Sequence, residues 1–209
     1  FRSIEEGYVK IIVTRGSDDH NFTIPARSAL QPNVLVYGKP IDLNAIEKVQ
    51  SGVNCITLDD DRGHHCDILS LNQLNNMMAR AEAQKKNCYD AVFIKDGLLT
   101  EASHSNVCIV KAGVIWTPAT NEHMIRGVTR SLVLTRAAPS AGVTSIDEAS
   151  EPVRFEDMMT AEEVFLTNSQ DGIIPVLSID GNPIGGGKVG DVTKKIQEHY
   201  AHLMEDGLP

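Results

Sequence analysis

The chain has 209 residues, of which 42% are hydrophobic and 22% are charged, a composition typical of a globular protein with one large core or two small ones. Its 19 basic and 28 acidic residues leave a formal charge of −9 without any basic run, so no nucleic-acid partner is expected. No apolar stretch approaches the roughly 20 residues of a membrane helix, so no membrane partner is expected either.

The hydrophobic pattern predicts mixed α and β structure. The first predicted strand, residues 9–14, is apolar enough to be a core strand. In chain order the predicted strands are 9–14, 34–37, 55–58, 91–94, 98–100, 107–110, 114–116, 143–146, 162–167 and 174–179. The predicted helices are 70–86, 128–138 and 191–204. Several strands follow each other as hairpins, which favours an α+β fold over a doubly wound parallel sheet.

Three local features refine this prediction. Residues 40–44 are a polar stretch that can separate two domains, 1–41 and 42–209. In the helix 70–86 one face carries apolar side chains, namely Leu71, Leu74, Met78 and Ala81. The helix 128–138 follows a glycine and is expected to end at Pro139.

The four cysteines are widely spaced and contain no C-x-x-C pair, which argues against a zinc site and favours reduced thiols in a cytoplasmic protein. No metal ligand set is predicted, since the adjacent His64, His65 and Cys66 have no evident partner cluster. The glycine-rich residues 185–190 are not a Walker motif, because Val189 stands where Ser or Thr is required. They are read as a loop before the last helix.

Two segments have residues suited to chemistry. Residues 99–106 follow a hairpin and carry Glu101, which can face a protonated nitrogen. Residues 124–130 open a helix, whose free N–H groups beside Gly127 and Thr129 can bind an anion. Asn168 and its neighbour Ser169 can supply a second set of donors.

Together these motifs resemble the fold type IV pyridoxal-phosphate enzymes, the class IV aminotransferase family. The resemblance covers nearly the whole chain and rests on an ordered series: T-E-A-S-x-S-N, W-T-P, R-G-V-T-R, A-E-E-V-F-L-T-N-S, I-I-P-V and V-G-D-V-T. Residues 13–16 and 62–72 look most like the D-amino-acid aminotransferase branch. The resemblance implies a large domain with a mixed, barrel-like sheet and flanking helices. It also implies a small α/β domain, whose second half residues 1–40 resemble.

The resemblance also implies site residues for pyridoxal 5′-phosphate. Glu101 matches the acidic residue that hydrogen-bonds the pyridine nitrogen and keeps the ring protonated. Val128 and Thr129, after Gly127, match the helix start that holds the phosphate. The other matches are Ser169 and its neighbour Asn168 in a second phosphate loop, Ile125 against the ring, and Arg62 near the phosphate.

At one catalytic position the chain departs from the family. The family reads C-D-I-K-S-L-N, and its lysine forms the Schiff base and shuttles a proton, but this chain has Leu69 there. Leucine has no amine, so it can do neither. Three interpretations stay open: a cofactor-modified lysine written with the wrong letter, an engineered change that traps a ligand, or a natural loss.

A second departure concerns the substrate. Typical D-amino-acid aminotransferases carry P-R-x-H after Thr-Arg-Gly, and its Arg and His grip the substrate carboxylate. Here His20 stands in place of the Arg and Phe22 in place of the His, so the bidentate clamp is missing.

The function expected from the resemblance is an aminotransferase that moves an amino group from an amino acid or amine to a keto acid, acting as a homodimer. Two alternatives remain. One is an aminodeoxychorismate lyase-like enzyme, which the motif around residues 167–176 also resembles. The other is a catalytically impaired cofactor-binding form, because of Leu69.

Overall fold

The computed structural model describes residues 7–17, 31–143, 145–148 and 151–206. The chain divides into two compact units, Phe1–Asn44 and Ala45–Pro209. The predicted division between residues 41 and 42 stays a prediction. No helix in the described ranges is long and apolar enough to cross a membrane.

The described part of the first unit contains a two-stranded antiparallel hairpin. Strand β1 (Gly7–Thr14) pairs with β2 (Asn33–Pro40) along its full length. The predicted strand is therefore confirmed, but its side chains are not in a core: Val9, Ile11 and Val13 are each about 60% exposed. A hairpin without a second layer in the described residues has nothing against which to bury them.

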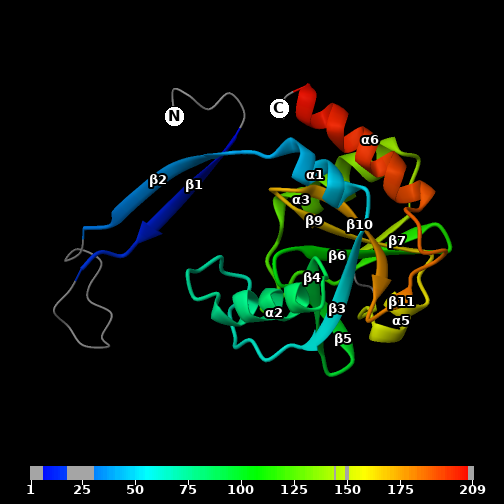
Figure 1. The fold of residues 1–209 in the computed structure, drawn as a ribbon, viewed down its shortest axis with the longest axis horizontal. Helices are drawn as coiled ribbons and strands as arrows, with labels where there is room; N and C mark the ends of the chain where they lie inside the picture. Colours follow the sequence, from blue (N-terminus) through cyan, green and yellow to red (C-terminus); the bar gives the residue numbers. More distant parts are fainter. Residues whose placement is uncertain (1–6, 18–30, 144, 149–150, 207–209) are drawn as a thin grey trace. The chain divides into compact units, whose positions relative to one another are not determined.

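The second unit is built on one mixed, nine-stranded sheet with the order β5-β4-β3-β10-β9-β6-β7-β8, and β11 pairs with β10 (Figure 1). Its strands are β3 (Val53–Asp59), β4 (Asp90–Lys95), β5 (Leu98–Ala102), β6 (Asn106–Lys111), β7 (Val114–Thr117), β8 (Ile146–Glu148), β9 (Glu163–Asn168), β10 (Gly172–Ile179) and β11 (Asn182–Pro183). Most pairings are antiparallel, but β3 runs parallel to β4 and β10, and β7 runs parallel to β8. The predicted α+β class is confirmed.

Helices cover this sheet on two sides (Figure 1). They are α1 (Leu43–Gln50), α2 (Leu74–Lys85), α3 (Val128–Leu132), the π-helical turn η1 (Val133–Ala137), α4 (Ala138–Ser140), α5 (Phe155–Met159) and α6 (Asp191–Glu205). On one face, the sheet packs against η1, α4 and α6, and its strands β3 and β4 pack against α2. The alternate strand residues point to the other face and form the largest core, which includes Met158 of α5. Helices α1 and α5 were not predicted from the sequence.

The face that α2 buries differs from the prediction. Ala79 and Ala83 are its buried residues, and they pack against β3 and β4. The predicted apolar face is exposed: the exposed fractions are 63% for Leu74 and 60% for Met78, and Leu71 precedes the helix. The prediction was wrong because periodicity identifies an apolar stripe but not which side of the helix meets the sheet, and here that side carries two alanines.

The helical segment after Gly127 also differs from its prediction, because it continues past Pro139. Its middle turn, η1, is π-helical, and Pro139 lies in the first turn of α4. Proline lacks an N–H, and a wider turn just before it removes the need for the usual hydrogen bond at that position. The segment ends at Gly142, whose φ of +83° suits glycine.

The glycine-rich loop before α6 is not an anion site, because a carboxylate of the chain already occupies the start of that helix. Glu163 on β9 accepts hydrogen bonds from the backbone N–H groups of Val192 (3.0 Å) and Thr193 (2.8 Å) and from the Thr193 hydroxyl (2.7 Å). A Cβ at Gly190 would collide with that carboxylate, so the glycine permits the close approach. The interpretation of this segment as a loop is supported.

We therefore expect Glu163→Ala to destabilise the protein by about 2 kcal/mol, because it removes three hydrogen bonds to a charged acceptor at a helix start. Urea denaturation followed by circular dichroism measures this change. Glu198→Ala, at an exposed position of the same helix, is the control and should change the unfolding free energy by less than about 0.5 kcal/mol. Equal effects from the two variants would contradict the capping role of Glu163.

Candidate active site

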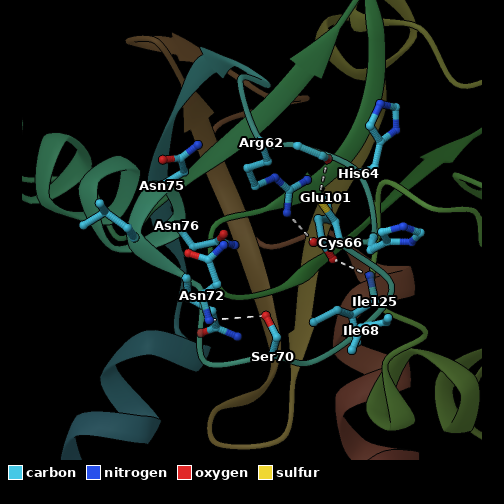
Figure 2. A pocket seen from close by; sticks show the side chains of 14 residues that line it. Arg62, His64, Cys66, Ile68, Ser70, Asn72, Asn75, Asn76, Glu101 and Ile125 are labelled. Carbon is cyan, nitrogen blue, oxygen red and sulfur yellow. Dashed lines mark hydrogen bonds and ion pairs between the residues drawn. The ribbon is translucent and has the colours of Figure 1, made fainter. Parts of the chain in front are cut away.

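A cavity of about 220 Å³ lies where residues 62–76 meet β5 and the segment before α3 (Figure 2). Three of the predicted site residues line it: Arg62, Glu101 and Ile125. The remaining lining residues come from the loop after β3 and from the first turn of α2: Gly63, His64, His65, Cys66, Ile68, Ser70, Asn72, Gln73, Leu74, Asn75 and Asn76. The sequence segments thus meet at one place, around a buried carboxylate.

The carboxylate of Glu101 is held from three sides. It accepts hydrogen bonds from Arg62 Nη1 (2.5 Å), from the backbone N–H of Ile125 (3.0 Å) and from Asn106 Nδ2 (3.4 Å). Glu101 as a whole residue is only 4% exposed. Burial raises the pKa of the Glu101 carboxyl, and the neighbouring guanidinium opposes that rise. The position follows from a tight turn at residues 96–97, both at positive φ, which starts β5 beside β4.

Arg62 is the cation of this site. Its Nε and Nη2 form a bidentate pair with the two carboxylate oxygens of Asp60, at 2.9 and 2.8 Å. Its Nη2 also donates to the carbonyl of His123 (2.9 Å), and its guanidinium lies 4.3 Å from the centre of the Phe93 ring. These contacts fix the guanidinium against Glu101, which the resemblance assigns to the ring nitrogen. The prediction that Arg62 lies near the phosphate stays untested.

Asp60 completes the buried charge cluster. Burial raises its pKa, but hydrogen bonds from Arg62 and from the Thr100 hydroxyl (2.7 Å) outweigh that effect and hold the pKa below its ordinary value. The Arg62 guanidinium therefore lies between two carboxylates. It binds Asp60 through two nitrogen atoms and Glu101 through one. Glu101 keeps one carboxylate oxygen paired with Arg62 and the other with amide N–H groups.

The helix start predicted to bind phosphate lies just beyond Ile125. Gly127 is the extended N-cap residue of α3, and no side chain caps the helix. The side chain of Thr129 is buried, whereas that of Val128 is exposed. Arg130, also buried, donates to Thr117 Oγ1 (3.1 Å) and to the Pro118 carbonyl (2.8 Å), which ties the helix start to the end of β7.

The second predicted loop follows β9. Asn168 Oδ1 accepts hydrogen bonds from the backbone N–H groups of Gln170 (3.0 Å) and Asp171 (2.7 Å), and its Nδ2 donates to Ser105 Oγ (3.1 Å). The Asn168 amide is thus committed to shaping the turn, while Ser169 is exposed on it. Neither residue lines the cavity, and nor do Gly127, Val128 and Thr129.

Leu69 is 74% exposed. Its neighbours Ile68 and Ser70 line the cavity, but Leu69 itself does not. The lysine position of the family thus lies at the cavity edge. The predicted substrate residues His20 and Phe22 lie outside the described residues.

Sequence reasoning missed three residues that hold Glu101 in place. No role was predicted for Asp60 from the sequence, although a carboxylate two residues before an arginine can form this bidentate pair. Thr100 and Asn106 are the first and last residues of the T-E-A-S-x-S-N motif, but the motif by itself did not indicate what their side chains do.

The charge cluster gives a prediction for Arg62→Met, which leaves two carboxylates buried without a cation. We expect a loss of about 3 kcal/mol in unfolding free energy at pH 7. The loss should shrink as the pH falls from 7 toward 3, because the pKa values of both buried carboxyls rise without the cation and the variant takes up protons over this range. Denaturation at several pH values measures this.

The control for that experiment is Arg136→Met, which removes an exposed arginine from η1. Its effect should be small and independent of pH. A deficit in Arg62→Met that stays constant from pH 3 to pH 7 would contradict the assignment.

Comparison with known proteins agrees with this geometry. The family model for amino-transferase class IV matches residues 2–179. D-alanine aminotransferase of Bacillus licheniformis is 38% identical over 192 residues, which are 92% of this chain and 65% of that protein. D-alanine aminotransferase of Staphylococcus aureus (strain N315) is 33% identical over 97% of this chain and 70% of its own length.

Among solved structures, the branched-chain amino acid aminotransferase of Escherichia coli matches with a TM-score of 0.80 and 24% identity, over 94% of this chain and 65% of that one. This match supports the fold type IV architecture. The chain spans about two thirds of the length of these relatives. The family match, the relatives and the shared fold lead to one conclusion: this chain belongs to the class IV aminotransferase family.

Proposed function

We propose that the protein is a pyridoxal-phosphate-dependent aminotransferase of the D-alanine aminotransferase type, which moves an amino group from an amino acid to a keto acid. The observation that carries this proposal is the carboxylate of Glu101, buried at the cavity between Arg62, Asn106 and the Ile125 N–H. Relatives that share 38% and 33% of their aligned residues with this chain are D-alanine aminotransferases.

The donors and acceptors of the site fit the cofactor. A buried carboxylate suits a protonated pyridine nitrogen, and Ile125 provides an apolar contact for a ring in the same cavity. The uncapped helix start at Val128 and Thr129, with the exposed Ser169, suits a phosphate. When bound, pyridoxal 5′-phosphate supplies a carbonyl that takes up the amino group and a ring that accepts negative charge from the substrate.

The role of Glu101 follows from its surroundings. A carboxylate that holds a proton on a ring nitrogen must itself stay ionised, although burial favours its neutral form. Arg62 opposes that tendency from 2.5 Å, and Asp60 and the His123 carbonyl keep the guanidinium in place. Glu101 is thus the cofactor-binding residue, and Arg62 positions it and keeps it charged.

At the phosphate end, we assign the contacts to the backbone N–H groups of Val128 and Thr129, to the Thr129 hydroxyl and to Ser169. Arg130 stabilises the start of α3, because its hydrogen bonds to Thr117 and Pro118 fix that helix start to the end of β7. Asn168 shapes the turn that presents Ser169.

Leu69 favours a second candidate, a form that binds the cofactor without a covalent bond and turns over poorly. Its side chain has no group that can hold or move a proton. Lys85 does not replace it, because it lies in the last turn of α2 and pairs with Glu82 at 2.5 Å. The proposed reaction therefore needs an amine that position 69 does not supply.

The variant Leu69→Lys tests both candidates. We expect transamination from D-alanine to a keto acid to rise by roughly three orders of magnitude or more, because a covalent and a general-base group return together. Pyruvate that forms from D-alanine over many turnovers only when a keto-acid acceptor is present identifies an aminotransferase. Pyruvate that is released from aminodeoxychorismate without any acceptor identifies a lyase.

The matched control is Leu43→Lys, which places the same amine at an exposed leucine of α1 that does not line the cavity. It should leave the rate at the level of the unchanged protein. If the transamination rate of Leu69→Lys does not rise although the cofactor binds, the proposed aminotransferase function is contradicted.

We also infer a cytoplasmic homodimer. The four free cysteines support the location. The exposed apolar surface beside the cavity supports a second copy of the chain as partner, because large exposed apolar patches mark interaction sites. This surface, called here the α2 outer face, consists of Ile68, Leu69, Leu71, Leu74, Met77 and Met78, each at least 59% exposed.

The variant Met77→Glu should weaken the dimer at least 10-fold, because it places a charge in the centre of the α2 outer face. Sedimentation at several protein concentrations measures the dissociation constant. Gln84→Glu adds the same charge at an exposed position of α2 outside that face and should have no effect. Dimerisation unchanged by Met77→Glu would assign the partner to another surface.

A further inference from the structure

Asn106 contacts both Glu101 and the segment that leads into α3, to which the proposed function assigns the two ends of the cofactor. It is the first residue of β6 and is 4% exposed. Its Nδ2 donates to the carbonyl of Ile125 (2.8 Å) and to Glu101 Oε2 (3.4 Å). The same Glu101 oxygen accepts the N–H of Ile125 (3.0 Å). The three groups therefore form a closed ring of hydrogen bonds.

The amide oxygen of Asn106, Oδ1, lies against the backbone of Gly127 at the start of α3. A Cβ added to Gly127 would collide with Asn106 Oδ1, and this Gly127 is the N-cap of α3. The φ of Gly127 is −64°, which any residue can adopt, so its lack of a side chain serves the close contact rather than the backbone conformation. One side chain thus sets the position of Glu101 and of residues 125–127 together.

Such an arrangement matters for a ligand with two charged ends. A carboxylate alone attracts any protonated pyridine, and a helix start alone attracts any phosphate. A fixed separation between them favours a ligand that carries both groups at that separation, because neither contact then requires movement of the site. Loss of the separation should cost the two-ended ligand more than a ligand that uses one end.

We propose that Asn106 is a positioning residue that fixes Glu101 relative to the helix start at Gly127 and thereby selects phosphorylated pyridines over their unphosphorylated forms. The proposal rests on the proposed function, since that function assigns the ring nitrogen to Glu101 and the phosphate to Val128 and Thr129. Asn106 itself needs no contact with the ligand.

The test compares the binding of pyridoxamine 5′-phosphate and pyridoxamine to the intact protein by calorimetry. Neither ligand needs an amine at position 69. In Asn106→Ala we expect the affinity for the phosphorylated ligand to fall about 10-fold more than the affinity for pyridoxamine. The absorbance of the bound phosphorylated ligand should also show that its ring nitrogen loses its proton at lower pH, because Glu101 is displaced.

Asn182→Ala is the matched control, since it removes an exposed asparagine from β11. It should change neither the affinity ratio nor the ring titration. Gly127→Ala disturbs the contact between Gly127 and Asn106 from the other side. It should also lower the ratio of the affinity for pyridoxamine 5′-phosphate to the affinity for pyridoxamine, so the proposal can be tested even if Asn106→Ala does not fold.

The outcomes separate the proposals. Equal weakening of both ligands in Asn106→Ala would mean that Asn106 serves Glu101 alone, and this would overturn the selection proposal. A lower melting temperature with unchanged affinity ratio and ring titration would overturn it as well. If the unchanged protein fails to bind pyridoxamine 5′-phosphate, the proposed function itself fails, and the inference falls with it.

Discussion

The ion cluster of Arg62 with Asp60 and Glu101 is the interaction on which the site depends. Its three members come from the loop after β3 and from β5, and the guanidinium also contacts Phe93 on β4 and the carbonyl of His123. Two carboxylates can stay ionised in a buried position only when a cation and other donors compensate them. The contacts that compensate these charges therefore join segments that are far apart in the sequence.

Much of the fold could be predicted from the sequence because its signals are local. Alternating and continuous apolar runs located the strands around residues 107–110 and 162–167, which form β6 and β9. The buried face of α2 could not be predicted in the same way, since Ala79 and Ala83 are weak hydrophobic signals next to Leu74 and Met78. Which face of a helix meets a sheet depends on the space available there, and that space is set by other elements.

In the site too, short sequence motifs could be recognised, but contacts between distant residues could not. The motif around Glu101 and the glycine before α3 were recognisable as short patterns, and the structure brings Arg62, Glu101 and Ile125 to one cavity. The partners of these residues were not recognisable. The pairing of Arg62 with Glu101 spans 39 positions, and the contact of Asn106 with Ile125 spans 19. Hydrogen bonds between distant positions leave no spacing rule in a single sequence.

The small inner face of α2 sets the distance between this helix and the sheet. On the helix side, Ala79 and Ala83 are the buried residues of this contact, and they pack against Ile56, Ala91 and Phe93 of β3 and β4. The first turn of α2 forms one wall of the cavity. A larger side chain at either alanine would push that wall outward and change the width of the cavity without any change in its lining. Alanine at these two positions thus works as a spacer, so residues with no chemistry of their own determine which ligands fit.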